Sequence, residues 1–149
     1  MIGQFEGSIQ QLVALAVLMP IVASMGGNAG TQTLTVVIRG MSTGTISHGN
    51  IFNVLKKETL VGILNGLIWA VVISIIAALW YQNIELGLVI AAAMIANLVM
   101  GAIAGVCIPI FLEKLNIDPA LAGGVALTTV TDVVGYFSVL GLATLILLG

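Results

Sequence analysis

Four long apolar segments, joined by short polar loops, make up almost all of this 149-residue chain. A run of about 20 apolar residues is long enough to cross the hydrocarbon of a bilayer as an α-helix. The lipid interior offers the backbone no hydrogen-bond partner, so each segment is predicted to be helical. The sequence therefore predicts an all-α, polytopic membrane bundle in which residues 1–149 form one transmembrane domain. Its four spans cover about residues 9–38, 60–80, 86–112 and 120–148.

The composition excludes an ordinary soluble domain. Hydrophobic residues make up 60% of the chain and charged residues only 7%, whereas soluble domains carry about 25% charged residues. The formal net charge of −2 gives no reason to expect nucleic acid as a partner. We find no nucleophile–base pair and no nucleotide-binding motif, so the sequence does not predict an enzyme.

The basic residues predict the orientation of the spans. Arg39, Lys56 and Lys57 lie between the first and second spans, and Lys114 lies between the third and fourth. The loop at residues 81–85 has no basic residue. Because basic loops stay on the cytoplasmic side, we expect a multi-pass protein of the cell's inner (plasma) membrane. Both ends of this chain would then lie outside.

Asp132 is the most informative polar residue, because it lies near the middle of the last apolar segment. An isolated carboxylate at the centre of a membrane helix costs about 2.5–3.5 kcal/mol on insertion scales. Such a residue faces a partner or a wet cavity rather than lipid. One interpretation is a hydrogen bond that ties two helices together. The interpretation that we favour is a cation site in a pore. By helical spacing, Gly124, Thr128 and Gly135 share a face with Asp132, and Thr129 lies beside it.

The first apolar segment contains a glycine-rich and polar stretch at residues 26–33. If this stretch is helical, Asn28, Thr31, Gln32 and Thr35 share one face. Glycines alone would fit close helix packing, but the two amides favour a surface in contact with water. The predicted pore lining comprises Gly26, Gly27, Asn28, Thr31, Gln32, Gly124, Thr128 and Thr129.

The side chains around Asp132 bear oxygen and neither nitrogen nor sulfur ligands, which is the preference of hard divalent cations. A single carboxylate is a weak match for a doubly charged ion. Two copies of Asp132 related by a twofold axis would match that charge, and cyclic dimers are the commonest oligomers. Mg²⁺ keeps several waters when bound, so a pore for it must be wide. The predicted metal site is therefore Asp132 in a homodimer.

Three further positions carry weaker predictions. Glu58 follows two lysines at the start of the second span and is predicted to be a solvated residue at a helix N-terminus. Asn97 is predicted to serve helix packing. Pro109 is predicted to kink or end the third helix near its cytoplasmic end.

Two stretches also resemble a known family, the MgtE-type magnesium channels. Residues 20–40, with Gly26-Gly27-Asn28-Ala29-Gly30-Thr31-Gln32 at their centre, resemble the second transmembrane helix of that family. The stretch from Asp118-Pro119-Ala120 to Thr131-Asp132-Val133-Val134-Gly135 is similar to its fifth helix. The order and length of the intervening spans also fit, so the resemblance covers essentially the whole chain.

The resemblance implies a homodimeric Mg²⁺ channel in the lipid bilayer. In it, Asp132 matches the ion-selecting aspartate that holds hydrated Mg²⁺ from both subunits. Thr128 and Gly124 match positions that line the same passage, and Asn28 with its glycine neighbours matches the facing helix. Apart from Mg²⁺ as the transported ion, the resemblance implies no cofactor.

The resemblance also implies segments that do not match this chain. Family members are expected to begin with cytoplasmic N and CBS domains, a connecting helix and a first membrane span. The sequence is thus expected to be a pore domain lacking these parts, either excised or naturally reduced.

Two alternatives from other classes stay open on the residues alone. A proton-coupled small-molecule exporter of the four-span dimer type also uses one membrane carboxylate. It needs an aromatic-lined cavity, however, and aromatic residues are only 5% of this chain. A purely structural membrane subunit would leave Asp132 and Gln32 unexplained.

Overall fold

The computed structural model describes the backbone of residues 2–47 and 49–146, with side chains from Val13 onward in those ranges. The four helices are α1 (Ile2–Ser42), α2 (Ile51–Tyr81), α3 (Ile84–Lys114) and α4 (Pro119–Ile146). Each contains a stretch long and apolar enough to cross a membrane. The prediction of an all-α fold with four spans is therefore confirmed for the described part of the chain. His48 in the first loop lies outside it.

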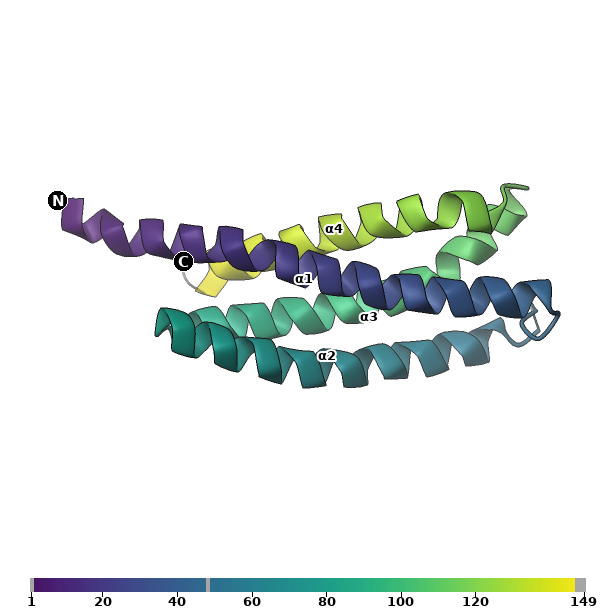
Figure 1. Cartoon of the computed structure of the whole chain (residues 1–149), viewed down its shortest axis with the longest axis horizontal. Coiled ribbons are helices and arrows are strands. Elements are labelled where there is room, and N and C mark those ends of the chain that lie inside the picture. Colours follow the sequence, from purple (N-terminus) through teal and green to yellow (C-terminus); the bar gives the residue numbers. More distant parts are fainter. Residues whose placement is uncertain (1, 48, 147–149) are drawn as a thin grey trace.

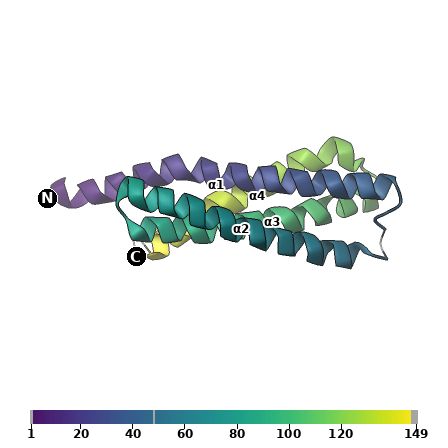
Figure 2. The same cartoon turned by 60° about the horizontal axis from the view of Figure 1, so that its bottom comes forward.

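The helices run side by side along the long axis of the molecule (Figure 1). Helices α1, α3 and α4 pack against one another, whereas α2 packs on α3 and barely touches α1. The start of α1 and the end of α4 lie at the same end of the bundle as the α2–α3 turn. The loops that follow α1 and α3 lie at the opposite end (Figures 1 and 2). The basic residues lie in the parts of α1, α2 and α3 next to these loops, so they are gathered at one end of the bundle.

Local sequence sets the ends of the helices. At the start of α3, Asn83 caps the helix, because its side-chain oxygen accepts a hydrogen bond from the Leu86 backbone N–H at 3.2 Å. At the start of α4, the Asp118 carboxylate accepts a hydrogen bond from the Ala120 N–H at 3.0 Å. Pro119 follows as the first helical residue, where its missing N–H leaves no bond unmade. These short capped turns hold successive helices antiparallel.

Two helix boundaries differ from the limits of the apolar runs or distinguish between predicted alternatives. Helix α2 begins at Ile51, well before the predicted start of the second span near residue 60. The charged residues at 56–58 lower the hydropathy there but do not prevent a helix. Pro109 does not end α3, which continues to Lys114. Figure 1 shows α3 bending toward the start of α4 in its last part, as the kink alternative predicted.

Glycines bring the backbones of α1 and α3 into contact. A Cβ atom on Gly101 would lie 2.7 Å from the Gly26 carbonyl oxygen. One turn further along, a Cβ on Gly105 would lie 2.8 Å from the Gly30 carbonyl oxygen. Both distances are too short for any side chain. The four-residue spacing of small residues in both helices therefore produces a close crossing, as is common between membrane helices.

Asn97 joins three helices at the centre of the bundle. It lies on α3 with no exposed surface, and its Nδ2 donates a hydrogen bond to the Val22 carbonyl of α1 at 2.8 Å. A Cβ on Gly135 of α4 would lie 3.0 Å from the same nitrogen. The Asn97 Oδ1 has no partner among the described residues. Asn97 therefore has the packing role that the sequence predicted.

Candidate ion-conducting surface

Helix α4 has one buried and one open side. Its buried residues Gly123, Leu127, Thr131 and Gly135 recur every fourth position and face α1 and α3. Asp132 follows the buried Thr131 and is partly exposed, midway along the helix. The hydrogen bonds made by described hydroxyls of α4 all go to backbone carbonyls of α4 itself, not to this carboxylate. The Asp132 carboxylate thus remains available to an outside partner.

The residues one and two turns before Asp132 are open as well. Thr128 and Gly124 are exposed, and a Cβ on Gly124 would meet no atom within 4 Å. Thr129 is exposed, with its hydroxyl donating to a carbonyl of its own helix at 2.9 Å. Gly135, which its spacing had placed on the same face as Asp132, is buried instead. It belongs to the packing against α1 and α3.

A second polar surface runs along α1. Asn28, Thr31, Gln32 and Thr35 are all exposed on this helix, and we call these four residues the α1 polar stripe. The hydroxyls of Thr31 and Thr35 donate to carbonyls four residues earlier, at 2.7 and 2.9 Å, so they keep their bonds within the helix. Helix α1 therefore continues unbroken through its glycine-rich stretch. The four residues were predicted to share one face if this stretch is helical, and the structure shows that it is.

The two consecutive glycines of α1 lie in different surroundings. Gly26 is buried, and a Cβ on it would collide with an α3 side chain. It therefore serves packing and does not reach the open surface on which pore lining was predicted. Gly27 is half-buried, and a Cβ on it would lie 3.4 Å from the Thr131 hydroxyl of α4. Since Thr131 precedes Asp132 and Gly27 precedes Asn28, the carboxylate and the amide lie at the same level of the bundle.

This level is the middle of the membrane-spanning helices, where exposed polar groups cannot face lipid without a large free-energy cost. The partly exposed carboxylate of Asp132 and the α1 polar stripe must therefore meet water or another protein surface. The two features lie on helices that pack directly against each other. Together they form one candidate surface for a cation.

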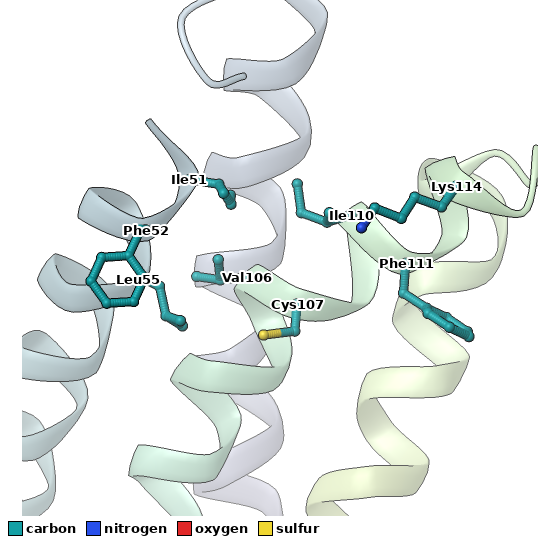
Figure 3. A pocket seen from close by; sticks show the side chains of 8 residues that line it. All are labelled: Ile51, Phe52, Leu55, Val106, Cys107, Ile110, Phe111 and Lys114. Carbon is teal, nitrogen blue, oxygen red and sulfur yellow. The ribbon is translucent and has the colours of Figure 1, made fainter. Parts of the chain in front are cut away.

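A different groove lies near the basic end of the bundle (Figure 3). It has a volume of about 290 Å³, and its lining is apolar except for one thiol and one amine. Cys107 points into it from α3, which leaves the thiol exposed. None of the described side chains that line this groove bears an oxygen atom, so the groove does not match the ligands that a hard cation prefers. It is lined by Ile51, Phe52, Leu55, Val106, Cys107, Ile110, Phe111 and Lys114.

Four membrane-length helices with a carboxylate and oxygen donors at mid-bundle define a polytopic membrane protein suited to moving cations. The comparison with known proteins agrees with that class. The MgtE family, described as a divalent cation transporter, matches residues 19–142. The chain therefore belongs to the MgtE family of divalent cation transporters, as the two stretches in its sequence predicted, and this is a family of transporters rather than of enzymes.

Individual relatives are similar along nearly the whole chain. The magnesium transporter MgtE of Bacillus subtilis is 40% identical over 143 residues, which cover 96% of this chain and 32% of that protein. The magnesium transporter MgtE of Enterococcus faecalis is 32% identical over 142 residues, covering 93% of this chain and 31% of that protein. That of Thermus thermophilus is 29% identical over 144 residues, covering 96% of this chain and 32% of that protein. The chain thus spans about a third of the length of these relatives.

Proposed function

We propose that this chain forms a channel for largely hydrated Mg²⁺ at the interface between two copies, with Asp132 of both copies selecting the ion. The observation that carries the proposal is the partly exposed carboxylate of Asp132 at mid-bundle, level with Asn28 of the α1 polar stripe. The names of the relatives, which are magnesium transporters, support Mg²⁺ as the ion.

The requirement for two copies follows from charge and from the ligand count. In the described part of one chain, no group of three His, Cys, Asp or Glu side chains converges on a point. A single copy therefore offers no closed cage, and its one carboxylate leaves half of the charge on a divalent ion unmatched. A second Asp132 would balance that charge. The exposed α1 polar stripe would then face the partner or the water of the pore instead of lipid.

The open surface beside Asp132 supports passage of an ion with its waters. Gly124 leaves free space, and the exposed Thr128 and Asn28 can form hydrogen bonds to water in the first shell of the ion. Mg²⁺ sheds that shell reluctantly, so a site that holds the waters is better suited to it than one that replaces them. Asp132 would act through those waters by its charge.

The same proposal assigns the membrane and the orientation. The loops that follow α1 and α3 lie at one end of the bundle, and the start of α1 and the end of α4 lie toward the other. By the positive-inside rule, we propose that these loops face the cytoplasm and that the protein lies in the inner (plasma) membrane of the cell. The exporter alternative loses its support, because the family moves divalent cations.

Transport by the purified chain is the direct test. Liposomes that contain this chain are expected to take up Mg²⁺ down its gradient faster than protein-free liposomes, as followed with an enclosed Mg²⁺-sensitive dye. Uptake equal to that of protein-free liposomes would contradict the proposal.

Assembly can be tested by cross-linking in lipid. Thr128→Cys in a Cys107→Ser background is expected to give a disulfide-linked dimer, since Thr128 is exposed beside Asp132 and would face its twin across the pore. The background change is needed because the native thiol is itself exposed. Cross-linked product is read by non-reducing gel electrophoresis.

A matched control for this experiment is Leu79→Cys in the same background. Leu79 is 74% exposed but lies on α2, away from α4, and should not cross-link. Equal cross-linking of the two variants, or none at Thr128→Cys together with monomers in native-like lipid, would rule out the proposed interface.

A further inference from the structure

A second polar groove lies between α1, α2 and α3, outside the surface formed with α4. Its volume is about 190 Å³, and its polar lining consists of Gln32 and Thr33 of α1 with Glu58 and Asn65 of α2. The Thr33 hydroxyl lies 3.5 Å from the Glu58 carboxylate, to which it donates a hydrogen bond. Four side chains that bear oxygen thus meet in one groove, and one of them is charged.

Glu58 lies deeper than its sequence neighbours indicated. Helix α2 begins at Ile51, so Glu58 is about 10 Å inside the helix at 1.5 Å per residue and is not at its N-terminus. Its partner Thr33 lies on α1 between Gly27, which is level with Asp132, and Arg39 at the basic end, about 9 Å from each. The Glu58 carboxylate therefore lies between the level of the proposed selective site and the basic end of the bundle.

The groove stays open because of the way in which α2 is packed. Gly62 lets α2 approach α3 closely, since a Cβ on it would lie 2.9 Å from the Ala102 Cβ. Helix α2 barely touches α1, which leaves the space between Glu58 and Gln32 unfilled. Gln32 belongs both to this groove and to the α1 polar stripe. The groove and the proposed pore surface are therefore continuous along α1.

We propose that this groove is an accessory binding site for a hydrated divalent cation, with Glu58 supplying the charge and Gln32, Thr33 and Asn65 hydrogen-bonding to the waters of the ion. This inference rests on the proposed function, because it makes the groove a holding site beside the same pore. No basic side chain lines the groove, so the charge of Glu58 is not already matched there.

The dimensions agree with a hydrated ion rather than a bare one. A water needs about 10–15 Å³ of such cavity volume, so 190 Å³ holds an ion together with several waters. One carboxylate makes this site weaker than a pair of Asp132 side chains. The accessory site is thus expected to fill only at higher Mg²⁺ concentrations than the selective site, and to hold ions near it.

A structural role for Glu58, as the acceptor of the Thr33 hydrogen bond, makes a different prediction. Glu58→Gln keeps the size of the side chain and a carbonyl oxygen that can accept the same hydrogen bond, but it removes the charge. The structural role therefore predicts unchanged cation binding in this variant. The accessory site predicts that binding is lost while the fold remains.

The test measures Mn²⁺ binding in lipid nanodiscs by electron paramagnetic resonance, with Mn²⁺ as a probe for Mg²⁺. In an Asp132→Asn background we expect a weak Mn²⁺ site to remain. Adding Glu58→Gln should lower its affinity by at least about tenfold, because the variant removes the only charged side chain that lines the groove. Excess Mg²⁺ should displace the bound Mn²⁺.

The matched control is Glu85→Gln in the same background, since Glu85 is exposed near the turn at the opposite end of the bundle and should leave the weak site intact. If Asp132→Asn alone removes all Mn²⁺ binding, or if Glu58→Gln leaves the weak site unchanged, the inference is overturned. Binding is measured without transport, so a failure of the proposed channel function would be seen separately in the liposome flux.

Discussion

Asp132→Asn is expected to lower Mg²⁺ flux into liposomes by at least about tenfold, with the fold retained. Asparagine has nearly the same size and still bonds to water, so helix packing should not change. It lacks the charge, however, and a unit charge about 5 Å from a doubly charged ion contributes roughly 7 kcal/mol at an effective dielectric of about 20. Two copies lose two such charges. Flux is measured with an enclosed Mg²⁺ dye, and selectivity by competition with K⁺.

The matched control for this variant is Asp118→Asn. Asp118 lies in the loop before α4 and caps that helix, and asparagine caps a helix about as well as aspartate. This variant should therefore retain the wild-type flux. If Asp132→Asn carries Mg²⁺ at the wild-type rate with unchanged selectivity, Asp132 is not the selecting residue and the proposed mechanism fails.

Gly101→Ala is expected to have the largest effect on stability, with a loss of about 1–3 kcal/mol in the free energy of unfolding, as is typical of an overpacked core. The added methyl would lie 2.7 Å from the Gly26 carbonyl oxygen. That oxygen belongs to the backbone of α1, so the strain can be relieved only by moving a whole helix. Alanine is the better helix former by about 1 kcal/mol, but that gain should be outweighed. Unfolding in mixed micelles, followed by circular dichroism, measures the change.

Gly141→Ala is the control that separates packing from helix propensity. A Cβ on Gly141 would meet no atom within 4 Å, so only the propensity term applies and stability should be kept or raised. Equal stability of Gly101→Ala and Gly141→Ala would mean that α1 and α3 are not held as closely as the structure indicates.

Much of the fold could be predicted from the sequence because a membrane allows few choices. Long apolar runs must be helices, and basic residues distinguish the two sides, so the number and order of the spans followed directly. Helix α2 starts before the predicted second span, because hydropathy reports where a helix becomes apolar and not where it begins. Lys56 and Lys57 lower the mean hydropathy of the first turns of α2, which begins at Ile51. The sequence allowed either a kink or a helix end at Pro109, because a proline can kink a helix without ending it.

The candidate site was only partly predictable, since spacing along one helix does not show which helix lies opposite. Asp132 and Asn28 were singled out as candidates because polar groups are rare in membrane spans. Gly26 and Gly135 were placed on the wrong faces, because a glycine leaves equal room for a neighbouring helix and for water. Glu58 was interpreted as solvated, and no local pattern could show that Thr33, far away in the sequence, lies beside it.

The central position of α3 has a consequence for variation among related proteins. Helices α1 and α4, which carry the proposed ion surface, are both held by α3 through Gly101, Gly105 and Asn97. The width of the proposed ion pathway therefore depends on residues that do not contact the ion. Substitutions that add or remove a single methyl group at these α3 positions should change the conductance, even though every residue at the proposed ion surface stays the same.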